Sequence, residues 1–179
     1  MIYTFPLALR YSEDYLTVRR LFDRDYFLHN LALRHANGSE DEAGILTLRQ
    51  IVYRRLDEKL ISAEALEQVV FASGGIPLDL VKLVSGAALY ALERNESATA
   101  IQLADAQNAI KDLRRELAAN LSMAEWQLLR QRHSDRMLSN EPAIQQLLYK
   151  GALIEYSNDV QWCDVHPALW GMLEYFAES

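Results

Sequence analysis

Cysteine is nearly absent from this chain of 179 residues, in which Cys163 is the only one. A single cysteine excludes an internal disulfide and a zinc ribbon, and it suits a reducing compartment. Basic residues are also in the minority, since 18 Lys and Arg stand against 25 Asp and Glu, and the formal net charge is -7. This balance opposes a broad electrostatic attraction to the phosphate backbone of nucleic acids.

Long apolar segments are missing as well. The first ten residues lack the basic start and the long apolar stretch of a secretory signal, which predicts a cytoplasmic protein. The most apolar region runs from Val69 to Leu92, but Gly74, Gly75 and Pro77 interrupt it. This pattern predicts two soluble helices joined by a turn, and no association with a membrane is expected.

Half of the residues are apolar, which is enough for a buried core in one domain or in two small ones. Near the N-terminus, Ile2 to Leu9 and Phe27 to Arg34 have the pattern of extended segments, and Ser12 is placed to cap a helix between them. Strand, helix and strand over about thirty residues have the size of one parallel crossover unit. We expect residues 1–43 to be a short α/β remnant of a larger core, with an open edge that is either covered locally or used for dimer contacts.

A polar stretch from Asn37 to Gly44 predicts a domain boundary, and Ser39 with Glu42 has the spacing of a capping box. Beyond it the apolar residues recur at the spacing of amphipathic helices. Four helices are expected, over 44–60, from behind Ser62 to Ser73, from Pro77 to Arg94, and over 103–120. The fold class is therefore mainly α, with a four-helix bundle over residues 44–120.

Residues 121–179 predict a second small unit. Ser122 and Glu125 form another capping box at the start of a helix, and Ser139 or Asn140 opens the next helix. Ala152 to Tyr156 and Val160 to Val165 then alternate like two strands around a Ser157-Asn158-Asp159 turn, and a last helix is expected from Pro167 to Phe176. Helix, helix and hairpin are the order of a winged-helix domain.

Two segments resemble motifs of nucleotide-binding proteins. Gly75-Ile76-Pro77-Leu78, inside the four-helix unit, resembles the lid motif of AAA-type ATPases and the GxP motif of the NB-ARC branch of STAND ATPases. His166, at the end of the predicted wing, resembles the MHD-like histidine of the same family. The order of core strands, helical lid and winged helix matches as well, so the resemblance covers nearly the whole chain.

The resemblance implies a site for ATP or ADP between an ATPase core and the lid. Gly75 and Pro77 would bind the nucleotide, with Pro77 against the adenine, and His166 would close the winged helix onto ADP. Leu78 stands where AAA lids commonly have an arginine, which favours the STAND comparison. Val165 and Pro167 flank His166, where the family has Met and Asp.

No G-x-x-x-x-G-K-[ST] phosphate-binding loop occurs in the sequence. The resemblance therefore implies an ATPase core encoded upstream of Met1 as the first partner, a further protein contact or self-association, and no cofactor or enzymatic activity for this chain in isolation. We expect no metal site, because His29, His35 and His133 lack the spacing of metal ligands.

Simpler interpretations of the same residues remain open. The two glycines and Pro77 also fit the end of one helix and the first turn of the next, and His166 fits a helix N-terminus. The alternative function is a winged-helix DNA-binding or transcription-regulator module. The helix before the wing has no Lys or Arg, which disfavours DNA binding unless the fold gathers five arginines into a stripe. These are Arg114, Arg115, Arg130, Arg132 and Arg136.

Overall fold

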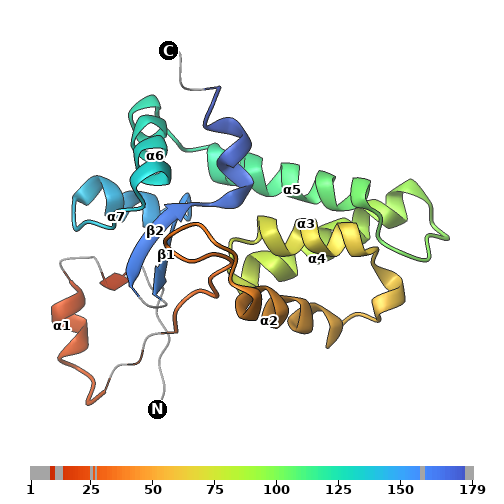
Figure 1. Ribbon diagram of the computed structural model, residues 1–179, viewed down its shortest axis with the longest axis horizontal. Helices are drawn as coiled ribbons and strands as arrows, with labels where there is room; N and C mark the ends of the chain where they lie inside the picture. The colour runs from red at the N-terminus through yellow and green to blue at the C-terminus, as the bar shows by residue number, and fades with distance from the viewer. Residues whose placement is uncertain (1–8, 11–13, 25, 27, 158–159, 176–179) are drawn as a thin grey trace.

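The computed structural model describes residues 9–10, 14–24, 26, 28–157 and 160–175. This part of the chain is mainly helical, as the sequence predicts, and it carries a two-stranded antiparallel sheet near its C-terminal end (Figure 1). A bundle of helices lies on one side of that sheet, and a pair of helices lies on the other.

The bundle consists of α2 (Glu42–Tyr53), α3 (Ala63–Ala72), α4 (Pro77–Arg94) and α5 (Leu103–Ala118). In Figure 1, α2 and α5 lie on opposite sides of α3, and each of the four helices contacts at least two others. Their apolar faces meet in one core because apolar residues recur every three to four positions. Fully buried members of this core include Leu48, Ala65, Val69, Leu80, Ala87 and Ala106.

Three of the expected helix boundaries in the bundle are confirmed. The Ser62 side chain accepts a hydrogen bond from the backbone N–H of Ala65 and caps α3. The helix ends at Ser73 because Gly74, with φ of +60°, takes the left-handed conformation that stops it. Pro77 occupies the first turn of α4, where its missing N–H removes no helical hydrogen bond.

The prediction for the first bundle helix is wrong at both ends. Its N-cap is Asp41, whose side chain accepts from the N–H of Gly44, and not the expected capping box built on Ser39. The helix stops at Tyr53, and a separate 3-10 turn, η2 (Glu58–Leu60), follows. The carboxylate of Asp57 accepts from the N–H of Lys59, and this local bond competes with a continued helix.

The C-terminal part has its own apolar core. Helices α6 (Met123–Asp135) and α7 (Pro142–Tyr149) pack against the hairpin of β1 (Leu153–Ser157) and β2 (Gln161–Val165). The expected capping box on Ser122 is confirmed. In contrast, the N-cap of α7 is Glu141, one residue beyond the expected Asn140, because Pro142 fixes the first helical residue.

The two expected strands form close to their predicted positions. They pair antiparallel, with Leu153 opposite Val165 and Tyr156 opposite Trp162. Asn158 and Asp159 of the predicted turn lie outside the described residues. The expected final α-helix is instead a 3-10 helix, η3 (Pro167–Met172), because the side chain of His166 accepts from Ala168 N–H and tightens its first turn. Phe176, the expected end of that helix, lies outside the described residues.

The expected strand-helix-strand unit near the N-terminus is not formed in the described part. Helix α1 (Tyr15–Arg19) is short, and residues 28–34 form no strand. Arg34 makes only an isolated antiparallel bridge with Glu40. The strand expected over residues 27–34 does not form because this segment lies beside a turn and side chains. These neighbours make single hydrogen bonds with it, whereas a strand needs a continuous ladder of backbone hydrogen bonds. The first expected strand falls outside the described residues except for Leu9, which lies in a 3-10 turn.

Residues 28–36, called the connecting segment below, lie between the bundle and the hairpin. Leu33 enters the core of the bundle, whereas Ala32 packs with Ile154, Tyr156 and Trp162 of the hairpin. The connecting segment therefore contacts both units, whose cores also meet through η3 and Leu117 of α5. This arrangement positions the candidate site, which lies where the bundle, the connecting segment and the hairpin meet.

Candidate functional site

The turn between α3 and α4 is the first part of the candidate site. Gly74 and Gly75 have φ angles of +60° and +80°, a region that side chains with a Cβ rarely adopt. A Cβ at Gly75 would lie 1.7 Å from the carbonyl oxygen of Leu31, so the connecting segment approaches the turn more closely than any side chain allows. The N–H of Leu31 donates to the carbonyl oxygen of Gly75 at 3.1 Å.

His166 is the second part, and it is fully buried. Its Nδ1 accepts a hydrogen bond of 3.2 Å from the N–H of Ala168, which leaves Nε2 as the nitrogen that carries hydrogen in the neutral ring. Nε2 lies 3.4 Å from Oδ2 of Asp79, in the first turn of α4, but the two atoms do not have hydrogen-bond geometry. The buried imidazole therefore faces the start of α4 with an unsatisfied nitrogen.

The fold brings the two predicted motifs together. The hydroxyl of Tyr156 donates a hydrogen bond of 2.7 Å to the carbonyl oxygen of Gly74, and the side chain of Ile154 fills the space above that glycine. A Cβ at Gly74 would lie 3.6 Å from His166 Nε2. Gly75 is buried in this contact, whereas Pro77 is exposed on the outer side of the turn. Of the three predicted site residues, Pro77 is thus the one open to solvent.

The start of α4 lacks a side-chain cap. Its N-cap residue is Ile76, whose side chain cannot accept a hydrogen bond from the first N–H groups of the helix. Such a helix end carries partial positive charge, which favours an anion. Asp79 supplies a carboxylate in this first turn.

The connecting segment is held from both sides. The guanidinium of Arg34 lies over the rings of Phe71 and Trp170, at 5.4 and 5.2 Å from their centroids, and so bridges α3 and η3 by cation–π contacts. Asn30 donates to the carbonyl oxygen of Glu155 in β1 at 3.1 Å. A small cavity of about 20 Å³ beside Arg34 has room for roughly one water molecule.

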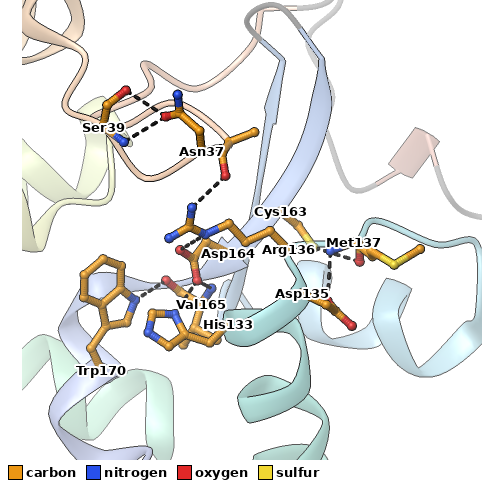
Figure 2. Close-up of polar contacts among 11 residues, drawn as sticks. Asn37, Ser39, His133, Asp135, Arg136, Met137, Cys163, Asp164, Val165 and Trp170 are labelled. Atoms are coloured by element: carbon orange, nitrogen blue, oxygen red, sulfur yellow. Dashed lines mark hydrogen bonds and ion pairs between the residues drawn. The ribbon is translucent and has the colours of Figure 1, made fainter.

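A polar network that the sequence did not predict holds the end of the connecting segment (Figure 2). Asp164, which is buried, accepts from the N–H of Val165 at 2.7 Å and lies 2.6 Å from His133 Nδ1. Arg136 approaches the same carboxylate at 3.7 Å and donates to the carbonyl oxygen of Ala36 at 2.6 Å. The network ties α6 and β2 to the connecting segment.

The sequence gives little warning of this network. His133 and Asp164 are 31 positions apart and belong to no recognisable motif. Arg136 is the only non-glycine residue with positive φ in the described chain, and it takes the left-handed conformation at the end of α6. Glycine is the usual residue in this conformation at a helix end, so an arginine there does not predict where the helix stops.

The His133–Asp164 pair does not form a nucleophilic centre. A histidine oriented by a carboxylate acts as a base in acyl transfer when a hydroxyl or thiol is hydrogen-bonded to its other nitrogen. Within the described residues, no Ser, Thr or Cys side chain bonds to His133. Burial raises the pKa of the Cys163 thiol to about 12, which keeps it protonated and unreactive.

The five arginines that would favour DNA binding belong to α5, to α6 and to the C-cap of α6. Four of them are engaged within the chain: Arg114 donates to Ala168 O, Arg115 pairs with Asp112, Arg132 binds Asp135 and Met137 O, and Arg136 binds Ala36 O. Arg132 is buried as well. Only Arg130 presents a side chain without such a partner among the described arginines of this set.

Comparisons with protein-family models, with curated proteins and with solved structures found no match for this chain. Among the described residues, no three His, Cys, Asp or Glu side chains come together in a way that would hold a metal ion. None of the described helices combines the length and the apolar character that a membrane crossing requires.

Proposed function

We propose that this chain is the helical lid and winged-helix portion of a AAA-type or STAND-type ATPase. The bundle α2–α5 is the lid, and α6, α7 and the hairpin are the winged helix. The lid closes on ATP or ADP held by a P-loop core that this sequence does not contain. In this proposal the chain is a regulatory and protein-contact module and has no catalytic activity of its own.

The observation that carries the proposal is the meeting of the two predicted motifs. His166 Nε2 lies 3.4 Å from Asp79, two residues after Pro77, although the motifs belong to different units of the chain. Two unrelated signals for the end and the start of a helix are not expected to contact each other. The two sides of a site that closes on a nucleotide are expected to do so. The direct bond from Tyr156 to Gly74 transmits any displacement of the turn to the hairpin.

Asp79 defines which state of the contact between the lid and the winged helix is seen in this structure. Its carboxylate lies 3.4 Å from His166 Nε2, in the first turn of the uncapped helix α4. In this proposal a nucleotide phosphate would take the place of that carboxylate. We therefore interpret the structure as the interlocked state, in which His166 is covered and only Pro77 is open to a base. Nucleotide bound by the core would compete with Asp79 and shift the angle between lid and winged helix.

The first test is genetic and needs no protein. The reading frame upstream of Met1 should encode a G-x-x-x-x-G-K-[ST] loop within about 250 residues, given typical domain sizes. A reading frame that starts at Met1, with no such core encoded beside it, would contradict the proposal.

The second test uses the protein with that core. Pro77→Ala should weaken ADP binding at least severalfold in isothermal titration calorimetry, because it removes the ring that packs on the adenine. Pro142→Ala is the matched control, since Pro142 also occupies the first turn of a helix, α7, and should leave ADP affinity unchanged. Equal affinities for the wild type and for Pro77→Ala would count against the nucleotide role of the turn.

A DNA-binding winged helix is the alternative, and the structure offers it little support. Helix α7, which precedes the hairpin, has no basic residue, and Lys150 beyond it is engaged by Glu125 at 2.6 Å and by the carbonyl oxygen of Asn120 at 2.7 Å. Fluorescence anisotropy with a random duplex at low salt separates the two functions. Saturation below about 1 µM, a range typical of specific complexes, would favour DNA binding.

A further inference from the structure

The outward face of α4 carries a line of apolar residues that are largely exposed in the described part of the chain. Leu80, Leu83, Ala87 and Ala91 on the opposite face are buried in the bundle. The outward line consists of Leu78, Val81, Ser85, Leu89 and Leu92, which fall within about 80° of the helix circumference at 3.6 residues per turn. Its four apolar members are 65%, 41%, 62% and 51% exposed, in the same order.

The line is symmetric about its centre. From Leu78 to Leu92 the spacings are three, four, four and three residues, so the pattern reads the same in both directions from Ser85. A two-fold interface requires such self-complementarity, because each residue of one copy must meet its counterpart in the other. In an antiparallel helix pair centred on Ser85, Leu78 faces Leu92 of the second copy and Val81 faces Leu89. The small Ser85 meets itself and lets the helix backbones approach closely.

We propose that α4 is a self-association surface on which a second copy of this chain packs antiparallel. No charged side chain lies on the line, so the two copies meet without burying an unpaired charge. The helix has 18 residues and is about 27 Å long, which accommodates the five contact levels. The proposed association does not require nucleotide.

The size of the surface sets the expected strength. A single helix pair covers less area than the roughly 800 Å² per partner of a standard interface, so the dimer is weak. Sedimentation velocity of the full chain should show a rising sedimentation coefficient between about 10 µM and 1 mM, the range expected for small interfaces. A wild-type chain that stays monomeric over this whole range would overturn the proposal and leave the face to a different partner.

Charge-reversal variants test the register of the pair. Val81→Lys and Leu89→Glu should each abolish self-association, because each buries an unpaired charge against an apolar side chain of the second copy. Mixed in equal amounts, the two variants should associate with each other, since the introduced lysine then faces the introduced glutamate. The double variant Val81→Lys/Leu89→Glu should recover self-association for the same reason.

Leu16→Glu is the matched control, since Leu16 is also an α-helical leucine and is 62% exposed like Leu89. It should associate as the wild type does, and far-UV circular dichroism should show unchanged helix content for every variant. Equal loss of association in Leu16→Glu and Leu89→Glu would assign the effect to net charge and overturn the proposal. Failure of the mixed variants to associate would equally exclude this antiparallel register.

Discussion

Tyr156 and Gly74 are joined by a hydrogen bond of 2.7 Å between the tyrosine hydroxyl and the glycine carbonyl oxygen. Tyr156 belongs to the hairpin and Gly74 to the turn between two bundle helices, so this bond crosses the contact between the two units. Both groups are buried, and burial raises the pKa of the Tyr156 hydroxyl, which therefore stays protonated and donates at all accessible pH values. The loss of stability when this hydrogen bond is removed therefore measures its contribution to the contact between the hairpin and the turn.

Tyr156→Phe should destabilise the chain by about 1–2 kcal/mol, because it leaves a buried carbonyl without its partner while it keeps the ring that stacks on Trp162. Urea denaturation followed by circular dichroism measures the free energy of unfolding. Tyr149→Phe is the control, since the Tyr149 side chain is exposed on α7, and its effect should stay within about 0.5 kcal/mol. Equal stabilities of the two variants would show that the hydroxyl contributes nothing to the contact.

Gly75→Ala should be more damaging, with a loss of about 2 kcal/mol or more. The added Cβ would meet Leu31 O at 1.7 Å, and the φ of +80° is strained for alanine, so the turn and the connecting segment must separate. Gly171→Ala, where no atom lies within 4 Å of the added Cβ, should be nearly neutral. The same denaturation experiment ranks the two variants, and a reversed order would contradict the close approach of Leu31 to the turn.

Local signals allowed much of the helical architecture to be predicted. Ser62, Pro77 and Ser122 each begin a helix as expected, because caps and N-terminal prolines act through neighbouring backbone groups and need no tertiary context. The hairpin strands were found for a similar reason, since alternation of apolar residues sets their faces.

The strand that does not form and the polar network that was missed both depend on distant partners. Residues 28–34 have an apolar pattern that suits a strand, but Leu31 pairs with a glycine turn and Ala32 packs on the hairpin, so no ladder forms. The His133–Asp164 contact joins α6 to β2 and follows from packing that no local spacing encodes. His166 lies beside Gly74, the neighbour of Gly75, while the roles of Gly75 and His166 toward nucleotide remain predictions.

The pair of Arg94 and Asp105 predicts how stability depends on pH. Both oxygens of the buried Asp105 accept from the Arg94 guanidinium at 3.0 Å, and this hydrogen bonding, with that from Gln102 N–H, holds the pKa of the carboxyl below its usual range. A folded-state pKa below the unfolded value of about 3.9 stabilises the fold above that pH. The stabilisation is lost as the pH falls below about 4 through the folded-state pKa.

Asp105→Asn should therefore be less stable than the wild type at pH 7, and the difference should shrink as the pH falls toward about 2. Urea denaturation at a series of pH values measures this convergence. Arg94→Gln, which removes the main cause of the lowered pKa, should converge with the wild type in the same way. A stability difference that stays constant from pH 7 to pH 2 would refute the assigned coupling.

The single thiol offers a readout of the contact between the two units. Cys163 lies in β2, is fully buried and donates to the carbonyl oxygen of Met137 at 3.2 Å, and its pKa is raised to about 12 by burial. At pH 8 its reaction with Ellman's reagent therefore requires unfolding, and the native chain should react at least about a hundredfold more slowly than the chain in guanidinium chloride.

If that reaction follows the open population, Tyr156→Phe should react about five- to thirtyfold faster than the wild type, as its expected loss of 1–2 kcal/mol requires. Tyr149→Phe should react at the wild-type rate. Since the chain has one cysteine, all of the absorbance change comes from β2. A faster thiol reaction in Tyr156→Phe without a matching loss of global stability would instead show that the hairpin opens separately from the bundle. The Tyr156–Gly74 bond would then stabilise the hairpin against local opening only.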